Sequence, residues 1–401
     1  MWTRVTFPKA NVDRQTNQIR VLPERCMIVL ARSVVLLGVG HTNAHILKEW
    51  ASDPIPDCRL VCISQYPTAT YSGMLPGTLA GQFSPNEMQI DLEKLVSRAG
   101  ATLIRADVTS VDWKQRVLKF SDTDSLSFNV LSVGVGSIPS GIPDPKTDCV
   151  IPVKPMQTFL RRLDDRMEFL APKSGRTLQI AVVGGGVASV EIALCLQTGF
   201  QLQFPAVNIK IRILTAADEI ASELAKNSIQ KIRRILHSRG IEVLTQTRVS
   251  EVNDSGMMMN GTEFLSADCV IWSTGAVAPP VLSRLGLPVD EHGFLLTSST
   301  LQSTADPMVF AVGDSGSITG IPFAKAGVYA VRQSPVLWHN LRSVLVGGPM
   351  TRFTPQHNFL KILNTGDDRA LMIYKSLAIH ARWCWTLKTW IDRRFLRRFQ
   401  S

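Results

Sequence analysis

Residues 33–43 read SVVLLGVGHTN, an apolar run of strand type followed by a turn containing Gly38 and Gly40 and by the start of a helix. The same pattern recurs at residues 179–189, which read QIAVVGGGVAS. Glycines let the backbone turn tightly and approach a pyrophosphate, whose negative charge then faces the free N–H groups of the following helix. Two copies, each between a strand and a helix, therefore predict two dinucleotide-binding units.

Each copy departs from the dinucleotide fingerprint at its third glycine. That position is Asn43 in the first copy and Ser189 in the second. The third glycine governs how closely the helix packs on the strand and does not itself contact phosphate. Because both replacements are small, we expect a slightly altered crossing of helix and strand, with nucleotide binding retained.

Strands and helices alternate along the chain, which predicts an α/β fold with two Rossmann-like units. A linker rich in Pro, Gly and Asp at 139–155 separates the two halves. In the first half we expect helices at 44–50 and 90–99, strands at 33–37, 59–63 and 102–106, and an antiparallel excursion over 110–133. In the second half we expect strands at 179–183, 208–214, 242–246, 270–274 and 308–312, and helices at 156–170, 223–239 and 325–345, the last kinked at Pro335.

Charge, cysteine content and apolar runs limit the partners and sites that this chain can have. The chain has 401 residues and a formal net charge of +10, which permits nucleic acid, an anionic membrane surface or acidic ligands as partners. Because no zinc finger, RNA-recognition signature or basic zipper accompanies the charge, we expect no nucleic-acid partner. The seven cysteines are scattered without a Cys-x-x-Cys pair, so we expect structural thiols and no metal site. No apolar run approaches the roughly 18 to 20 residues of a membrane-spanning helix.

This order of elements resembles the pyridine nucleotide-disulfide oxidoreductases, flavoproteins with two dinucleotide sites, over roughly residues 33–398. Within that superfamily the chain looks most like type II NADH dehydrogenases and apoptosis-inducing-factor-like proteins. The strings GVGHT (38–42), YSGMLPG (71–77), KAGVYAVRQ (325–333) and IDRRF (391–395) resemble the subgroup often fused to selenide, water dikinase. This chain stops where that kinase would begin, so a separate dikinase is a partner that the resemblance suggests. The resemblance implies FAD and NADH as cofactors.

The resemblance also implies how the chain is divided. We expect an FAD-binding domain that is interrupted by an NAD(P)H-binding domain, and a small C-terminal region. The expected divisions are an N-terminal extension (1–32), a first FAD-binding segment (33–155), the NAD(P)H-binding domain (156–285), a second FAD-binding segment (286–345) and a C-terminal region with a basic aromatic tail (346–401). The extension does not have the pattern of a secretion signal, so we expect a cytoplasmic protein, with peripheral attachment to a membrane surface as the alternative.

FAD is expected on the first glycine turn and at a second FAD motif, Gly313-Asp314. In the family the Asp carboxylate accepts hydrogen bonds from the ribityl hydroxyls, and an acid at the carboxyl edge of an α/β sheet suits that role. The helix after this motif begins near Lys325 and points its N–H groups at the flavin edge where negative charge grows on reduction. The residues expected to bind FAD are Gly38, Gly40, His41, Thr42, Ser64, Gly136, Gly313, Asp314, Lys325 and Gly327.

Two side chains are candidates for catalysis. Lys325 either adds a cation beside the flavin or is a solvated residue of the first helical turn. Glu191 looks like the superfamily's acid at the nicotinamide side, although an acid in the first turns of a helix also favours the helix dipole. We expect His41 to be a polar helix-start residue without catalytic duty. Gln333 stands where type II NADH dehydrogenases have a Gln-rich helix around the quinone. Because their full motif is absent, we expect a polar surface residue in preference to a quinone contact.

NADH is expected on the second glycine turn. The acid that normally holds the adenosine ribose is missing from both halves, where Ser64 and Thr215 stand instead. Residues 216–219, AADE, follow Thr215 with no nearby cation to receive a 2′-phosphate, so we expect NADH in preference to NADPH. The residues expected to bind the nucleotide are Gly184, Gly186, Ser189, Glu191, Thr215 and Gly275.

The expected activity is hydride transfer from NADH to FAD, followed by delivery of the electrons to a quinone or another small acceptor. Unpaired cysteines argue against a disulfide reductase, which needs a dithiol beside the flavin. Residues 382–399 interleave aromatic and basic side chains, as surface-lying membrane helices do; alternatively Trp385, Ile391, Phe395 and Phe399 pack on the protein's own core. Two rival functions remain: a flavin-binding interaction or regulatory module without turnover, and a membrane-surface quinone reductase.

Overall fold

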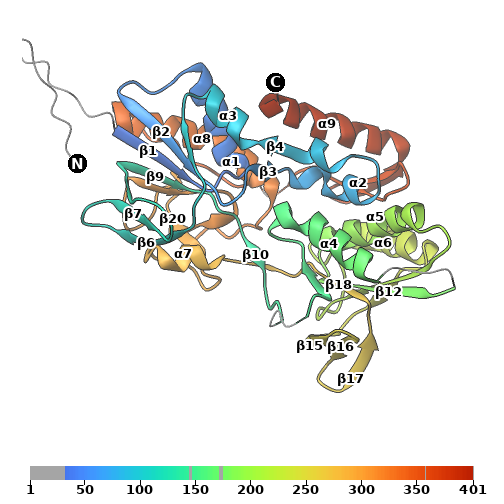
Figure 1. The fold of residues 1–401 in the computed structure, drawn as a ribbon. Coiled ribbons are helices and arrows are strands. Elements are labelled where there is room, and N and C mark those ends of the chain that lie inside the picture. The colour runs from blue at the N-terminus through green and yellow to red at the C-terminus, as the bar shows by residue number, and fades with distance from the viewer. Residues whose placement is uncertain (1–31, 144–146, 171–174, 357, 401) are drawn as a thin grey trace, which may run out of the picture.

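The computed structural model describes residues 32–143, 147–170, 175–356 and 358–400. It contains two five-stranded sheets with helices packed on them, and the chain passes from the first sheet to the second and back again (Figure 1). The predicted fold class, α/β with two Rossmann-like units, is confirmed. The extension expected at 1–32 lies outside the described residues except for Arg32, which begins the first strand.

The first sheet has the strand order β21-β9-β1-β2-β5, and all of its pairings are parallel. Its strands are β1 (Arg32–Leu37), β2 (Cys58–Ile63), β5 (Thr102–Ile104), β9 (Val130–Val133) and β21 (Val309–Ala311). The apolar run of β1 fills both faces of the sheet, as expected of a central parallel strand. One face is covered by α1 (His41–Ser52), α3 (Leu92–Arg98) and α8 (Gly327–Val346).

The opposite face of the first sheet is covered by an antiparallel sheet. Its strands are β6 (Val108–Asp112), β7 (Val117–Phe120) and β8 (Leu126–Ser127), and α7 (Pro280–Arg284) packs beside them. Alternate residues of β1 serve the two sides: Val35 and Leu37 pack with this antiparallel layer, whereas Val34 and Leu36 pack under the helices.

The second sheet has the order β11-β18-β12-β13-β14 and is also parallel throughout. Its strands are β11 (Val150–Pro152), β12 (Thr177–Val183), β13 (Asn208–Leu214), β14 (Glu242–Leu244) and β18 (Cys269–Trp272). Helices α4 (Met156–Leu170), α5 (Val187–Gln203) and α6 (Lys226–Ser238) pack on one face, and the antiparallel strands β15 (Val249–Asn253), β16 (Gly256–Met259) and β17 (Glu263–Ser266) pack on the other.

Both sheets place the strand that leads into a glycine turn at the centre. β1 has β2 on one side and β9 on the other, and β12 has β13 on one side and β18 on the other. Each glycine turn therefore lies at the carboxyl edge of its sheet where the strand order reverses, which is where open α/β sheets bind ligands. The repeat seen in the sequence is thus a repeat of topology.

The chain crosses between the halves at β10 (Ile138–Pro139) and β19 (Ala276–Val277), which pair antiparallel. β11 therefore belongs to the second sheet, although the expected boundary at 155/156 puts it in the first FAD-binding segment. Likewise α7 packs on the first half, although it precedes the expected boundary at 285/286. A strand of three residues inside a Pro-rich linker is too short to show the alternating pattern of a strand. This explains why the sequence does not predict β11.

The C-terminal region forms a third, antiparallel sheet of β23 (Lys361–Asn364), β24 (Ala370–Tyr374) and β25 (Leu377–Ala381), followed by α9 (Arg382–Gln400). In Figure 1 α9 is the red helix that lies beside α2 (Leu75–Leu79). It packs on this sheet, on β4 (Gln89–Asp91) and on α1. The helix expected at 90–99 is thus divided into β4 and α3, and α8 continues through Pro335.

Close packing of α2 on α5 fixes the NAD(P)H half against the FAD half. A Cβ added at Gly199 of α5 would collide with the carbonyl oxygen of Leu79 in α2. We therefore predict that Gly199→Ala lowers the free energy of unfolding by roughly 1–3 kcal/mol, because backbone on both sides must shift. Urea unfolding followed by circular dichroism measures the change. Gln201→Ala, at an exposed position of α5, is the control, and equal stability of the two variants would contradict the prediction.

Candidate dinucleotide and electron-transfer site

The first glycine turn is held open by the absence of side chains. Gly38 has a φ of 80°, and a Cβ there would lie 2.7 Å from the carbonyl oxygen of Gly134. Gly40 directly precedes α1 and has no side chain to cap it, so the first N–H groups of the helix remain for a phosphate. The Thr42 hydroxyl faces the other way and donates to the carbonyl oxygen of Ala330 in α8 at 2.8 Å.

The residues that replace the third glycines have one role in common. Asn43 donates to the carbonyl oxygen of Gly38 at 2.7 Å and accepts from the Ser132 hydroxyl at 2.8 Å. Ser189 donates to the carbonyl oxygen of Ser273 at 3.1 Å. In both halves a small polar side chain therefore joins the helix to the backbone beside the glycine turn. A glycine at this position normally lets the helix pack closely on the strand. Here hydrogen bonds from Asn43 and Ser189 join the two instead.

The second FAD motif holds an ionised acid. Gly313 has a φ of 61°, and the Asp314 carboxylate accepts from the Ser137 hydroxyl at 2.7 Å and from the Lys154 ammonium at 2.9 Å, both on Oδ2. Burial opposes ionisation, but the charge and hydrogen bond of Lys154 outweigh it and hold the pKa of Asp314 below its usual value. The carboxylate can therefore accept from hydroxyl groups, as the predicted contact to the ribityl chain requires. The N–H of Gly136 donates a hydrogen bond to the Ser315 hydroxyl oxygen at 2.9 Å.

Lys154 is a site residue that no sequence motif indicates. It follows β11, a strand of the second sheet, yet its ammonium binds Asp314 of the first half. Only the fold brings these two residues together, because they are 160 positions apart. In the sequence Lys154 stands in the Pro-rich linker, where nothing distinguishes it from other linker residues.

Gln333 is buried, and the expectation that it lies at the surface is wrong. Its side chain is 1% exposed, and its Oε1 accepts a hydrogen bond from the N–H of Gly313 at 2.6 Å. The reason is the packing of α8 against the second FAD motif, which turns this face of the helix inward. Gln333 thus positions the turn that presents Asp314.

Lys325 is held by backbone and is not a freely solvated residue. Its ammonium donates to the carbonyl oxygen of Gly316 at 2.7 Å and to the Ser317 hydroxyl at 2.8 Å, and lies 4.1 Å from the centre of the Phe294 ring. Burial lowers the pKa of Lys325 to about 8. These contacts anchor the loop ahead of Gly327, the first residue of α8. A cationic role beside the flavin stays a prediction.

His41 begins α1 inside a group of aromatic rings. Its ring lies 5.5 Å from Tyr71 and 5.8 Å from Phe395, measured between ring centres. Burial lowers the pKa of His41 to about 4, so the side chain is neutral near pH 7. Because the imidazole is neutral, the charges near this turn are those of the α1 helix start and of the Asp314 carboxylate.

Ser64 closes a local turn where the adenosine end of FAD is expected. Its hydroxyl donates to the carbonyl oxygen of Tyr66 at 2.9 Å and accepts from the N–H of Tyr66 at 3.2 Å. A hollow beside it is lined by Gln65, Arg105, Ala106 and Asp107, which follow β2 and β5. Of these residues, Gln65, Arg105 and Asp107, which no motif in the sequence indicates, are the polar side chains available where the usual acid is missing.

The second glycine turn leaves an open cradle. A Cβ at Gly184, whose φ is 131°, would collide with the carbonyl oxygen of Ser273, and one at Gly185 would collide with the Thr215 side chain. A Cβ at Gly186, directly ahead of α5, would meet nothing within 4 Å. The room above Gly186 and the start of α5 fit the diphosphate of a dinucleotide.

The remaining residues of this half serve the frame around the cradle. The Thr215 hydroxyl accepts from the N–H of Ala217 at 3.2 Å, and the carbonyl oxygen of Gly275 accepts from the N–H of Ser140 at 2.7 Å. Gly275 thereby joins the end of the second half to the segment that leads into it from the first half. Because a hydroxyl can donate while it accepts, Thr215 can also face a ribose.

Glu191 is partly buried where the C-terminal region meets α5. Its Oε1 accepts from the backbone N–H of Asn364 in β23 at 2.7 Å. Burial raises the pKa of Glu191 to about 7, against the opposing effects of the Lys388 charge and of the Asn364 hydrogen bond. A carboxyl group with this pKa both binds and releases a proton near neutral pH.

Lys388 and Asp392 of α9 extend this buried group toward the FAD half. The Lys388 ammonium donates to the carbonyl oxygen of Gly73 at 2.7 Å and to Asp392 at 3.0 Å, and Asp392 also accepts from the Tyr71 hydroxyl at 3.0 Å. Burial would lower the pKa of Lys388, but the carboxylates of Glu191 and Asp392 raise it above its usual value. We call Glu191, Lys388, Asp392 and Tyr71 the buried polar cluster.

Apart from Glu191, the buried polar cluster has no clear signal in the sequence. Lys388 and Asp392 stand four residues apart and so share one face of a helix, but within a basic aromatic tail that spacing is typical of an ordinary surface ion pair. The pair differs from a surface ion pair because it is buried: the Lys388 and Asp392 side chains are 12% and 5% exposed. That burial comes from packing against segments far away in the sequence.

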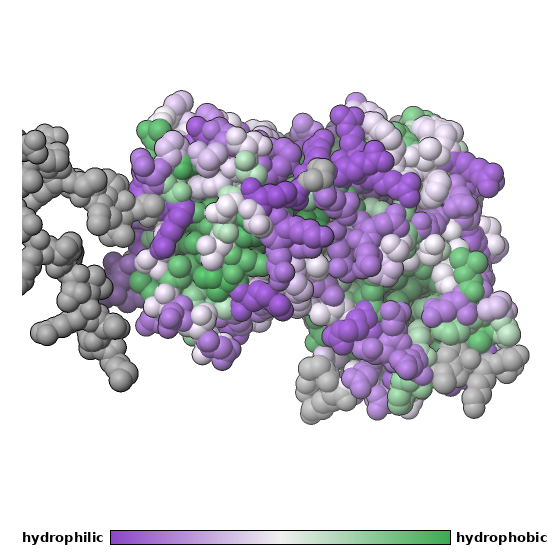
Figure 2. All heavy atoms as spheres, turned by 45° about the horizontal axis from the view of Figure 1, so that its top comes forward, coloured by the Kyte–Doolittle hydropathy of each residue, from purple (hydrophilic) through white to green (hydrophobic). Residues whose placement is uncertain are grey.

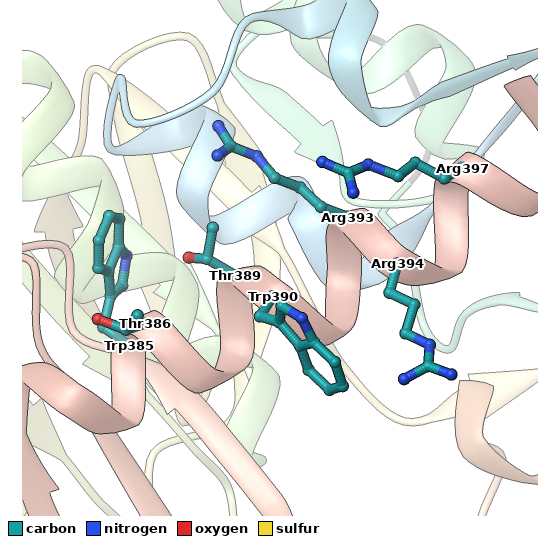
Figure 3. A pocket seen from close by; sticks show the side chains of 7 residues that line it. All are labelled: Trp385, Thr386, Thr389, Trp390, Arg393, Arg394 and Arg397. Atoms are coloured by element: carbon teal, nitrogen blue, oxygen red, sulfur yellow. The ribbon is translucent and has the colours of Figure 1, made fainter.

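The aromatic residues of the tail serve mainly as core. Phe395 stacks on Tyr71 with ring centres 4.5 Å apart, Phe399 is buried, and the Trp385 indole N–H donates to Gln82 at 3.2 Å. The packing alternative therefore holds for these residues and not for Ile391, which is 39% exposed. Figure 3 shows the outer side of α9, where Thr389, Arg393 and Arg397 point one way and Trp390 and Arg394 the other.

Within the described ranges, no three His, Cys, Asp or Glu side chains are grouped so that they could hold a metal ion. The six cysteines that the structure describes are free. Five of the six are buried, and burial raises the thiol pKa, for instance at Cys62 and Cys269.

The open space at Gly186 gives a test of the second cradle. We predict that Gly186→Val leaves the fold and the flavin content unchanged, because a Cβ at this position has no protein atom within 4 Å, but weakens NADH binding at least roughly tenfold by filling the diphosphate position. Titration of the protein with NADH, followed by calorimetry, measures the affinity. Unchanged NADH affinity in a folded variant would refute the assignment.

Comparison with known proteins agrees with this geometry. A family model described as pyridine nucleotide-disulphide oxidoreductase matches residues 32–340. The demethylphylloquinone reductase of Synechocystis sp. is 25% identical over 342 residues, covering 80% of each chain. The type II NADH:quinone oxidoreductase of Staphylococcus saprophyticus is 21% identical over 350 residues, covering 80% of this chain and 85% of that protein.

Solved structures share the fold at low identity. The sulfide:quinone oxidoreductase of Aquifex aeolicus superposes with a TM-score of 0.75 at 15% identity, covering 92% of this chain and 91% of that one. The NDH2 of Plasmodium falciparum, solved in complex with NADH, has a TM-score of 0.74 at 15% identity, covering 92% and 97%. With the family model spanning both glycine turns and the second FAD motif, the chain belongs to the pyridine nucleotide-disulphide oxidoreductase family and is an FAD-dependent NAD(P)H oxidoreductase.

Proposed function

We propose that this oxidoreductase oxidises NADH and reduces a quinone. The balanced reaction is NADH + quinone + H⁺ → NAD⁺ + hydroquinone, so the protein must supply one proton besides the hydride of NADH. Two of the curated relatives are quinone reductases by name. The observation that carries the proposal is the buried polar cluster, which offers a titrating acid, Glu191, where α5 meets the C-terminal region.

The glycine turns and the second FAD motif are the proposed binding groups for the two dinucleotides. The start of α1 and Asp314 would hold FAD, and the start of α5, with Gly184 and Gly186, would hold NADH. Bound FAD would accept the hydride and pass the electrons to the second substrate.

Proton delivery is the proposed role of Glu191. An acid is most effective as a proton donor when its pKa lies near the working pH, and burial raises the pKa of Glu191 to about 7. Lys388 lies close enough for its charge to act on Glu191, and it is itself held by Asp392. Once Glu191 has given up its proton, the Lys388 ammonium stabilises the carboxylate that is left. The cluster can then take up a proton again.

The rival function, a flavin-binding module without turnover, predicts a different response of the flavin absorbance to NADH. Anaerobic mixing of the purified yellow protein with NADH should bleach the flavin absorbance, and a soluble short-chain quinone added afterwards should restore it. A spectrum that stays oxidised with NADH would reject the enzyme. Bleaching followed by reoxidation with oxygen but not with a quinone would reject the quinone as acceptor.

The proton donor predicts a definite pH dependence. Because a donor must be protonated, reoxidation of the reduced protein by a quinone should be fast below pH 7 and fall as pH rises through about 7, the pKa of Glu191. We predict that Glu191→Gln slows this step about a hundredfold at pH 6 and removes its pH dependence near 7. Stopped-flow absorbance at several pH values measures both effects.

The control for this prediction is Glu242→Gln, which removes an exposed carboxylate of β14 that pairs with Arg212. It should leave the pH profile unchanged. A Glu191→Gln variant that keeps the wild-type profile would show that the proton comes from elsewhere.

Peripheral contact with a membrane is proposed as the way in which a lipid-soluble quinone reaches this site. No helix in the described portion of the chain is long and apolar enough to cross a membrane. Trp383 and Trp390 of α9 are 51% and 55% exposed, and the guanidinium of Arg394 lies over the Trp390 ring. Aromatic rings beside arginines suit the interface of an anionic membrane. Figure 2, with the α9 side turned forward, shows mostly hydrophilic residues over this half, so contact would rest on a few side chains.

We predict that the double variant Trp383→Ser, Trp390→Ser floats with anionic phospholipid vesicles roughly tenfold less than the wild type, because two large exposed apolar surfaces are lost. Flotation on a density gradient measures the bound fraction. Phe264→Ser, which removes an equally exposed ring from β17, is the control. Equal flotation of the double variant and the control would reject the membrane contact.

Association with a separate selenide, water dikinase stays a prediction of the resemblance.

A further inference from the structure

The loop between β13 and α6 forms one wall of the NADH cradle. The N–H of Ala221 in this loop donates to the carbonyl oxygen of Gly185 at 2.6 Å, so the loop is fastened to the glycine turn itself. Thr215, the first residue after β13, packs its side chain against Gly185. The loop therefore stands where the adenosine ribose of a nucleotide on this turn must lie.

Three carboxylates of this wall have different partners. Asp218 accepts from the side-chain amide of Gln246 at 3.0 Å. Glu223 accepts from the N–H of Val187, the first residue of α5, at 3.3 Å. Glu219 accepts from the guanidinium of an arginine, and the hydrogen bond from that residue lowers the pKa of Glu219. The wall is thus negative beside the cradle.

The arginine that binds Glu219 corrects one expectation. Residues 216–219 have no cation near them in the sequence, but α6 brings Arg233 to them from 14 residues away. Its Nε donates to both carboxylate oxygens, at 2.9 and 3.2 Å, and a terminal guanidinium nitrogen lies 2.6 Å from Oε1. A guanidinium is the side chain best suited to a phosphate, and here a carboxylate already occupies its donors.

We propose that the Glu219–Arg233 pair determines the choice between NADH and NADPH. With Glu219 in place, the donors of the Arg233 guanidinium are occupied and its charge is neutralised, so the pair offers nothing to a 2′-phosphate and the site takes NADH. Without the carboxylate, Arg233 presents its donors beside the ribose and becomes a phosphate-binding group. The wall therefore contains a latent NADPH site. The inference rests on the proposed use of a nicotinamide nucleotide at the second glycine turn.

The test compares variants of the holoenzyme with two probes, 2′,5′-ADP and ADP-ribose, by calorimetry. In Glu219→Gln the affinity for 2′,5′-ADP should rise at least roughly tenfold and that for ADP-ribose should change less than about twofold. The ratio of kcat/KM for NADPH over NADH should rise by a similar factor. Asp218→Asn is the matched control, because it removes the same charge from the same loop without touching Arg233. It should leave the ratio near the wild-type value.

Two further variants separate a specific effect from a general change of charge. Adding Arg233→Gln to Glu219→Gln should abolish the gain for 2′,5′-ADP. Arg233→Gln alone exposes an unpaired Glu219 and should weaken 2′,5′-ADP binding further. The pair is 44% and 36% exposed, so these changes leave the core intact.

The outcomes distinguish this inference from the proposed function. If the wild type binds ADP-ribose and is reduced by NADH, but Glu219→Gln leaves the ratio unchanged or Asp218→Asn raises it equally, the pair does not set the preference. A gain that survives Arg233→Gln overturns the inference as well. If the wild type neither binds ADP-ribose nor is reduced by NADH, the proposed function itself fails.

Discussion

The N–H groups at the start of a helix carry partial positive charge that nothing within the helix neutralises, and both halves of this protein place such groups beside a glycine turn. In α5 the first of them, the N–H of Val187, is held by the Glu223 carboxylate, and in α1 no side chain caps the helix start. Gly38 and Gly184 adopt left-handed φ values at points where a Cβ would strike a neighbouring strand end. The strand order then places each helix start at the edge of a parallel sheet. Everything else in the site is arranged around these two positions.

The C-terminal region converts two similar halves into one asymmetric site. Glu191 on α5, Tyr71 ahead of α2, and Lys388 and Asp392 on α9 come from three separate regions of the chain and meet in one buried polar cluster. A buried charge is tolerated only when it is paired, and here each carboxylate has a donor and the ammonium has an acid and a carbonyl. Apolar packing of α9, through Phe395 and Phe399, limits the access of water to the group.

The sequence predicted the repeated strand–turn–helix units and most elements of both sheets, because glycine turns and apolar runs are local signals. The helix at 156–170 and the strand at 208–214 agree with α4 and β13 residue for residue. It did not predict the burial of Gln333, the partnership of Lys154 with Asp314, or the approach of Arg233 to Glu219. Each of those depends on which face of a helix or strand turns inward, and that is determined by contacts between distant segments.

The ion pair between Lys154 and Asp314 ties the two sheets together through the acid that is expected to hold the flavin's sugar alcohol chain. Any hinge motion at the crossing strands β10 and β19 would stretch that bond, so opening of the molecule and loosening of the prosthetic group share one energetic cost. By thermodynamic reciprocity, a ligand that clamps the halves together would also tighten the grip on the flavin, and a loaded flavin would favour the closed arrangement. The Lys154 ammonium thus adds to the α2–α5 packing a polar contact between the two halves that depends on the charge of Asp314.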